Sequence, residues 1–393
     1  MRAAWHVRLA AIVPRSSSFR TAFLISIVAL LLAAGGRVVD AQAPAPVPPM
    51  AEASGADLYR AACAACHGLD GSGSPPSAIG FVDLAVPDFT DCAFGTVEPD
   101  GDWLAVAHDG GPARGFDRRM PAFGEILTEA QILRIIDHLR TFCTDRAWPR
   151  GDLNLPRALF TEKAFPENES VFTTSIGGGT SGSVTHEVVY EKRFGSRNQY
   201  EVVVPLALEE SAAGQWNRGL GDVAVALKRV LFHSLQRGII VSAAGEVVLP
   251  TGKEALGLGK GVTIFEPFLA AGKIFPRNTF VHLQAGAELP TDRDKAEAEA
   301  FWRTAIGATF EQPGFGRAWS PMVEILGARE LEQGQTVQWD AVPQMQVTLN
   351  QRQHLMINAG VRIPLTGRDD GRRAQFVTYF LWDWFDGGLR DGW

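Results

Sequence analysis

The stretch that decides the fold of the larger part of the chain is Thr279–Leu289, which reads T-F-V-H-L-Q-A-G-A-E-L. From Val281 onward every second residue is apolar, while His282, Gln284 and Glu288 between them are polar. Successive side chains of a β-strand point to opposite faces, so this alternation predicts a strand with one apolar and one polar face.

The same period of two extends in both directions along the chain. It is regular in 344–350 and 354–363, and less regular in 200–208, 223–231, 239–247, 262–270 and 376–384. Clusters of Gly, Pro, Asn and Asp separate these segments and indicate turns. Residues 171–393 therefore predict about a dozen antiparallel strands, each near the 9–11 residues that a tilted membrane-crossing strand needs.

Two all-β architectures produce such alternation. A soluble sandwich turns its apolar faces inward and uses shorter strands, whereas an outer-membrane barrel turns them toward lipid. The long strands, the large polar side chains and the aromatic residues near segment ends favour the barrel. We therefore predict a transmembrane β-barrel of about 12 strands, with a soluble β domain as the alternative. The last strand is expected to end at Phe385, before a Gly-rich tail over 386–393.

The first half of the chain carries a different motif, because residues 61–68 read A-A-C-A-A-C-H-G. The C-x-x-C-H pattern is the attachment signature of a c-type haem. Two thiols on one turn can each form a thioether with a haem vinyl group, and the next residue, His67, then lies beneath the iron as an axial ligand. A redox dithiol or a zinc site would not need a histidine directly after Cys66. One covalently attached haem c is therefore expected on Cys63 and Cys66.

Helices are expected on both sides of this motif. Residues 54–62 offer an apolar side at Leu58, and residues 128–131 have the form of a capping box. The box opens a segment whose apolar residues recur at three and four, which predicts an amphipathic helix that packs on the first one. The expected helical domain covers residues 54–146.

This domain resembles the class I cytochrome c domain, which ends in a Met-Pro loop followed by a C-terminal helix. The loop here is Arg119-Met120-Pro121. The resemblance implies that Met120 is the distal ligand of the haem iron, and a thioether ligand paired with His raises the potential of the iron. His108, beside Asp109-Gly110-Gly111, is the rival for the sixth position.

A haem iron held by both His67 and Met120 has no open position for a substrate. The expected role is therefore outer-sphere transfer of single electrons rather than catalysis, although the sequence leaves open whether the chain serves an oxidoreductase as a subunit. The layout resembles the porin–cytochrome fusions of bacterial extracellular electron transfer. The implied partners are other periplasmic or outer-membrane redox proteins and the lipid of the outer membrane.

Two alternatives to an electron conduit remain open at this point. The barrel could pass a small solute, with the cytochrome as a plug or redox sensor. The chain could instead be a soluble periplasmic cytochrome whose β domain docks a dehydrogenase. Nucleic acid is a poor candidate partner, because the net charge is −7 and phosphate binding needs a basic face.

The remaining segments complete the predicted organisation. Residues 1–41 have the basic start and apolar run of a secretory signal peptide, with an uncleaved anchor as the alternative. An Ala/Pro-rich linker is expected over 42–53, and a second linker over 147–170. Export to an oxidising compartment and the commitment of two cysteines to haem leave Cys92 and Cys143 as a disulfide pair, with free buried thiols as the alternative.

Overall fold

The computed structural model describes residues 51–393 apart from 82, 85, 179–181, 212–213 and 368–370. The predicted signal peptide and most of the first linker lie outside the described residues. No helix in the described part of the chain is long and apolar enough to cross a membrane.

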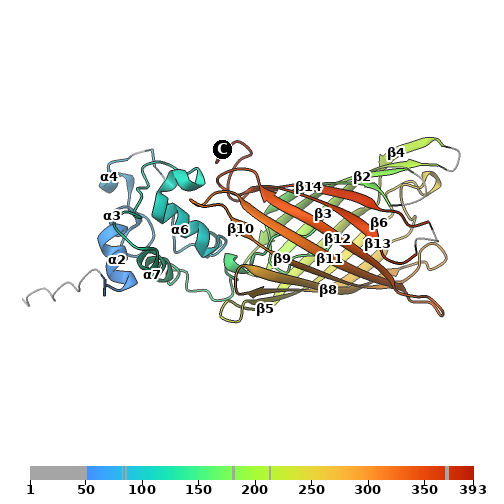
Figure 1. Ribbon diagram of the computed structural model, residues 1–393, viewed down its shortest axis with the longest axis horizontal. Coiled ribbons are helices and arrows are strands. Elements are labelled where there is room, and N and C mark those ends of the chain that lie inside the picture. The colour runs from blue at the N-terminus through green and yellow to red at the C-terminus, as the bar shows by residue number, and fades with distance from the viewer. Residues whose placement is uncertain (1–50, 82, 85, 179–181, 212–213, 368–370) are drawn as a thin grey trace, which may run out of the picture. The chain divides into compact units, whose positions relative to one another are not determined.

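Residues 55–139 form the helical domain (Figure 1). Its helices are α2 (Gly55–Ala62), α3 (Ala64–His67), α4 (Pro76–Ile79), α5 (Cys92–Gly95), α6 (Asp100–Asp109) and α7 (Glu129–Leu139), with the 3₁₀ turn η1 (Gly111–Arg114). Ser54 caps α2 by accepting from Asp57 N. Thr128 and Gln131 form the predicted capping box at the start of α7.

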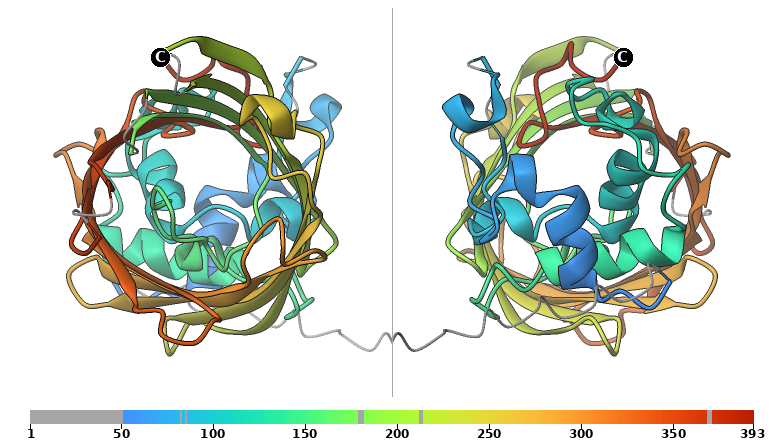
Figure 2. Two further views of the ribbon diagram at one scale, coloured as in Figure 1. Left: turned by 90° about the vertical axis from the view of Figure 1, so that its right-hand side faces the viewer. Right: turned by 90° about the vertical axis from the view of Figure 1, so that its left-hand side faces the viewer.

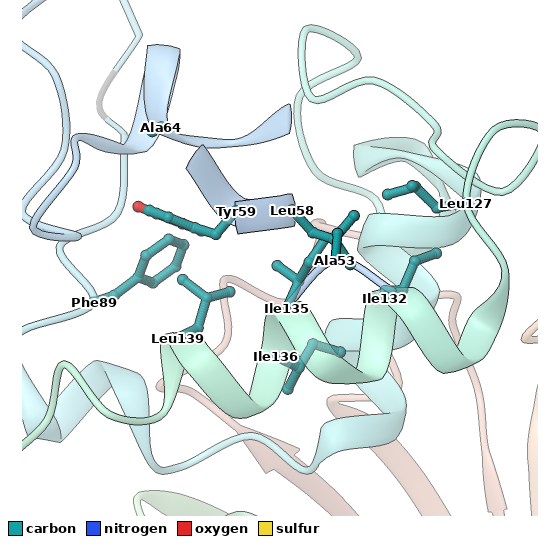
Figure 3. Packing of buried hydrophobic residues seen from close by; sticks show 10 residues of the cluster. All are labelled: Ala53, Leu58, Tyr59, Ala64, Phe89, Leu127, Ile132, Ile135, Ile136 and Leu139. Atoms are coloured by element: carbon teal, nitrogen blue, oxygen red, sulfur yellow. The ribbon is translucent and has the colours of Figure 1, made fainter. Parts of the chain in front are cut away.

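Helix α2 packs on α7 as expected. The apolar side of α7 faces Leu58 and Tyr59 of α2, and Figure 3 shows Ile132, Ile135 and Leu139 on that side. Gly55 lies where the two helices meet, because a Cβ at this position would overlap the carbonyl oxygen of Arg134. The close approach of the helices therefore depends on a glycine that the sequence pattern did not single out.

The rest of the chain is an antiparallel β-barrel. Its wall consists of β1 (Glu169–Gly177), β2 (Ser183–Phe194), β3 (Asn198–Glu210), β5 (Val223–Ser234), β6 (Ile239–Leu249), β7 (Ile264–Phe275), β8 (Thr279–Pro290), β9 (Glu299–Ala308), β11 (Ala318–Glu330), β12 (Gln338–Thr348), β13 (Leu355–Pro364) and β14 (Gln375–Asp383). The short strands β4 (Trp216–Leu220) and β10 (Phe310–Glu311) pair only with β3 and β11.

The sheet closes because β9 also pairs with β11, and β1 pairs with β14. Figure 2 shows the closed ring in two end views. The predicted fold, an all-α domain followed by a closed barrel of 12 strands, is confirmed. The last strand ends at Asp383 rather than at Phe385, since the chain turns away from β1 at that point.

The barrel has an apolar exterior and a polar interior. Large apolar side chains on the outside remain exposed, as at Leu227 (62%), Ile306 (58%) and Leu269 (55%). Inward-facing polar side chains are instead buried: Glu191, Gln199, Lys228, Ser242, His282, Gln284, Glu324, Gln344 and Asn358. A soluble sandwich would bury its apolar face, so this distribution is the one expected of a barrel surrounded by lipid.

The two ends of the barrel differ in the length of their connections. At the end where β1 begins, strands are joined by short turns such as 195–197, 235–238 and 276–278. We call it the short-turn end. At the opposite end, the long-loop end, connections such as 211–222 and 250–263 join the strands.

The predicted linker over 147–170 connects the two domains, but the structure does not support its interpretation as a simple linker. It contains the 3₁₀ turn η2 (Gly151–Leu153), and Leu153, Ala158, Thr161 and Phe165 are almost fully buried. The segment lies within the ring of strands, where it is drawn in green in Figure 2. Its lack of periodicity reflects an irregular backbone that is buried inside the barrel.

Candidate haem site

The C-x-x-C-H motif occupies the junction of α2 and α3. Cys63 ends α2 and precedes α3, while His67 is the last residue of α3. The amide of His67 donates to the carbonyl of Cys63 at 3.0 Å, so one helical turn holds the motif together. Gly68, at φ 75°, then takes the chain away in a conformation that favours glycine.

Tyr59 fixes the exit from this turn. Its hydroxyl donates to the carbonyl of Gly68 at 2.6 Å and lies 3.2 Å from the carbonyl of His67. The ring is only 1% exposed and meets His138 and Phe142 edge-on. Burial raises the pKa of Tyr59 above its usual value, so the hydroxyl stays protonated and can donate.

The imidazole of His67 has the properties required of an axial ligand. Burial lowers its pKa to about 4, so at neutral pH the ring is uncharged and keeps a lone pair for a metal. It stacks on Phe89, with ring centroids 4.8 Å apart and planes inclined by 23°. Its Nδ1 atom is buried without a hydrogen-bond partner.

The two motif cysteines also fit covalent attachment. Cys63 and Cys66 are free thiols, whereas Cys92 and Cys143 form a disulfide with Cα atoms 5.0 Å apart. Burial and the neighbouring Cys66 raise the pKa of Cys63 to about 11, so it is not a reactive thiolate by itself. Two thiols on one turn beside a buried neutral imidazole are the donor set that a c-type haem requires.

Met120 lies in the loop between η1 and α7. Its carbonyl accepts from Gly111 N at 3.0 Å, and a Cβ on Gly111 would lie 3.3 Å from the Met120 Cβ. Phe123 of the same loop packs on the hydrophobic core to which Cys63 also contributes. The loop therefore shares a core with the haem-attachment turn, and the role of Met120 as distal ligand stays a prediction.

His108, the rival ligand, is engaged elsewhere. Its Nδ1 lies 2.5 Å from Asp109 Oδ1, and its ring lies 5.6 Å from that of Phe315 in the connection between β9 and β11. These contacts place the imidazole between the helical domain and the barrel, and the choice between Met120 and His108 stays a prediction.

Two arginines, one buried and one half-buried, join the helical domain to the barrel. Arg114, 2% exposed, contacts Asp102 (2.6 Å), Glu311 (2.8 Å) and the carbonyl of Phe315. Arg352, from the turn between β12 and β13, donates to the carbonyls of Arg114 and Gly115. These reciprocal contacts anchor the helical domain at the short-turn end.

A cavity of about 230 Å³ lies between the helical domain and the segment 151–157. Its wall includes Glu98 and Asp102 of the helical domain and Asp386 of the C-terminal tail. Burial raises the pKa of Glu98 to about 8, and the pKa of Asp386 is also raised, by burial and by its neighbour Glu98.

Residues 51–139 match the family model described as "Cytochrome C oxidase, cbb3-type, subunit III". This segment is a cytochrome c domain. The match covers less than a quarter of the chain, since it spans 89 of 393 residues. No curated protein sequence matches the chain.

The barrel is similar to solved outer-membrane proteins. The NanC porin is 6% identical, with a TM-score of 0.39, over 55% of this chain and 98% of the porin. The KdgM porin is 8% identical, with a TM-score of 0.36, over 55% and 98%. An outer membrane channel from Pseudomonas putida F1 is 11% identical, with a TM-score of 0.42, over 58% and 99%.

The assignment of Cys63, Cys66 and His67 to a haem stays a prediction, and sequence reasoning missed the residues that hold this motif in place. Tyr59, Phe89 and Gly55 hold the motif turn, the His67 imidazole and the helix crossing, respectively. Tyr59 and Gly55 both stand in the segment 54–62 that the pattern assigned to a helix. Phe89 lies in an irregular loop, where no periodic pattern points to a buried side chain.

Proposed function

We propose that this chain is an outer-membrane cytochrome that exchanges single electrons through one haem c on the periplasmic side of its barrel. The observation that carries the proposal is the joining, in one chain, of a C-x-x-C-H turn in a cytochrome c domain to a closed barrel with an apolar exterior. The haem would be attached to Cys63 and Cys66, with His67 and Met120 as axial ligands.

The surface of the barrel supports insertion into a lipid bilayer. Exposed Leu, Ile, Val and Phe side chains cover the outside of strands that are 9–13 residues long. Burial of apolar surface is worth about 25 cal/mol per Å², so exposing this exterior to water would be unfavourable. Closure also pairs each of the 12 wall strands on both sides, as a lipid environment demands.

The connections support a periplasmic haem domain. Outer-membrane barrels have short periplasmic turns and longer extracellular loops. The cytochrome c domain precedes β1, which begins at the short-turn end, and Arg114 and Arg352 hold it there. The domain would therefore face the periplasm.

The residues of the site favour electron transfer over catalysis. A c-type haem supplies a one-electron couple at its iron, with a potential raised by a thioether ligand. His67 offers a neutral imidazole, while Tyr59 and Phe89 keep its turn and ring in place. With Met120 on the other side no position remains for a substrate, so the chain would act as an electron carrier.

The partners follow from this location. Periplasmic or outer-membrane redox proteins would exchange electrons with the exposed side of the cytochrome c domain. A hydrocarbon core about 30 Å thick separates the short-turn end from the cell exterior, and one haem does not span it. Transfer to the outside would therefore need an external partner that reaches into the barrel from the long-loop end.

The test is expression in a host with haem-attachment machinery. We expect haem-stained bands in the outer-membrane fraction whose mobility changes on boiling, and a cytochrome c domain that is protected from protease in intact cells but cleaved after permeabilisation. A Cys63→Ala/Cys66→Ala variant is the control, since it should keep the heat-dependent mobility and lose the stain. Haem that is found only in the soluble periplasmic fraction would contradict the proposal.

A further inference from the structure

The segment 153–167 runs into the barrel and returns to the same end. Leu153 and Phe165, near its two ends, pack with Val230 and Ile240 close to the short-turn end. Ala158 packs with Met322 of β11, two residues before the middle of that strand. The chain thus enters beside η2, turns at 159–162 and comes back to begin β1 at Glu169.

The tip of this excursion is bound by one carboxyl group of the barrel wall. Glu324, 0% exposed and in the middle of β11, accepts from the amides of Leu159 (3.0 Å), Phe160 (3.1 Å) and Thr161 (2.7 Å). The Thr161 hydroxyl donates to it at 2.6 Å, and Gln344 Nε2 donates at 2.5 Å. The carboxyl group of Glu324 thus binds three consecutive amides and fixes the tip of the segment to the barrel wall. We call this set of contacts the latch.

Other wall residues hold the remaining polar groups of the tip. Arg303 Nη1 donates to the carbonyl of Phe160 at 3.0 Å, and Gln284 Oε1 accepts from the amide of Glu162 at 3.1 Å. Each partner comes from the inward face of a different strand. Because a buried backbone group without a partner is costly, this set of contacts is a site built for the segment.

The returning limb is bound in the same way. Lys228 Nζ donates to the carbonyl of Lys163 at 3.0 Å, and Ser242 Oγ donates to that of Ala164 at 2.5 Å. Gln199 Oε1 accepts from the amide of Glu167 at 2.6 Å. Contacts with the wall therefore follow the segment along its whole path and not only at its tip.

We infer that residues 153–167 are a resident plug, latched by Glu324, that keeps the barrel closed to solutes. The inference goes beyond electron transfer and does not depend on it. It also assigns the blocking role to this segment and not to the cytochrome c domain. A barrel of this kind is a closed scaffold at rest and becomes a channel only when the latch is released.

The test is the conductance of the purified full-length protein in planar lipid bilayers. The wild type is expected to lack a steady open state. Glu324→Ala leaves the amides of Phe160 and Thr161 without their acceptor, while that of Leu159 keeps Gln344 Oε1 at 3.1 Å. Arg303→Ala removes the donor to the carbonyl of Phe160. Both variants should raise the open fraction at least about tenfold. Glu324→Gln, which keeps one acceptor oxygen, should lie between wild type and Glu324→Ala.

The matched control is Glu330→Ala, which removes a glutamate side chain from the same face of β11 at the long-loop end of the strand. It should conduct like the wild type. Heat-dependent mobility selects the variants that have folded. Steady conductance of the wild type, or folded Glu324→Ala and Arg303→Ala barrels as closed as the wild type, would overturn the inference.

Discussion

The disulfide between Cys92 and Cys143 gives a prediction whose size follows from the chain. The bridge closes a separation of 51 residues, from the start of α5 to the segment after α7. For a loop of this length, the loss of unfolded-state entropy is worth about 4 kcal/mol at 25 °C. A Cys92→Ser/Cys143→Ser variant should thus lower the free energy of unfolding of the cytochrome c domain by about that amount.

The folded domain should survive this change, because a second connection joins the same regions. Arg140, just after α7, donates to the carbonyls of Gly95 (2.5 Å) and Glu98 (2.8 Å) and lies 2.9 Å from Asp100 Oδ1. These contacts exist only in the folded state. The spectrum of the folded protein should therefore stay unchanged while the unfolding equilibrium shifts by almost three orders of magnitude.

The assay is guanidinium chloride unfolding of the full chain in detergent, followed by haem absorbance. We expect a lower midpoint and a steeper slope, since the slope reports the surface exposed on unfolding and the unfolded chain without the bridge is less compact. An Ala93→Ser variant controls for a new hydroxyl in α5. A midpoint that shifts by the equivalent of less than about 1 kcal/mol would refute the entropic reasoning, because far more is expected for a loop this long.

Four further outcomes can be measured on the same material. Met120→Ala should keep the covalent haem but lose the charge-transfer band of thioether-ligated ferric iron and show a lower reduction potential in a redox titration; an unchanged band would remove Met120 from the site. Thr128→Ala should lower the free energy of unfolding by about 1 kcal/mol in the denaturant titration, because it removes the N-cap of α7. Arg114→Met leaves Asp102 without its partner and should cost about 3 kcal/mol in the same titration, with faster proteolysis at the boundary of the cytochrome c domain. The pKa of Glu98 is raised to about 8. The protonated carboxyl therefore contributes fully to the free energy of unfolding below about pH 4.5, and this contribution is lost as the pH rises through 8. The unfolding midpoint of the wild type should fall over this range and that of Glu98→Gln should fall less; equally steep falls would contradict the assignment.

The barrel could be predicted because the sequence pattern of each strand depends on that strand alone. The alternating segments 279–289 and 355–363 correspond to strands β8 and β13. An apolar exterior and a polar interior impose a period of two on each strand of a barrel. The capping box at Thr128 is equally local and is present at the start of α7. The cytochrome c domain could be predicted because haem attachment by this class of domain requires a fixed C-x-x-C-H spacing.

The plug could not be predicted, because its partners are distant in sequence. Leu159 and Glu324 are 165 residues apart, and Phe160 and Arg303 are 143 apart. The segment has no period, and its backbone hydrogen-bonds to side chains rather than to a neighbouring strand. A polar residue at an inward position such as 324 looks the same in the sequence whether it faces water or a buried amide.

The path of the plug has a consequence for assembly. The segment enters and leaves the barrel at the same end. Strand β1 can therefore pair with β14 and close the barrel without the chain having to be threaded through the lumen. With the proposed location, the cytochrome c domain would not have to cross the bilayer, so haem attachment and strand closure could take place in either order within a single compartment.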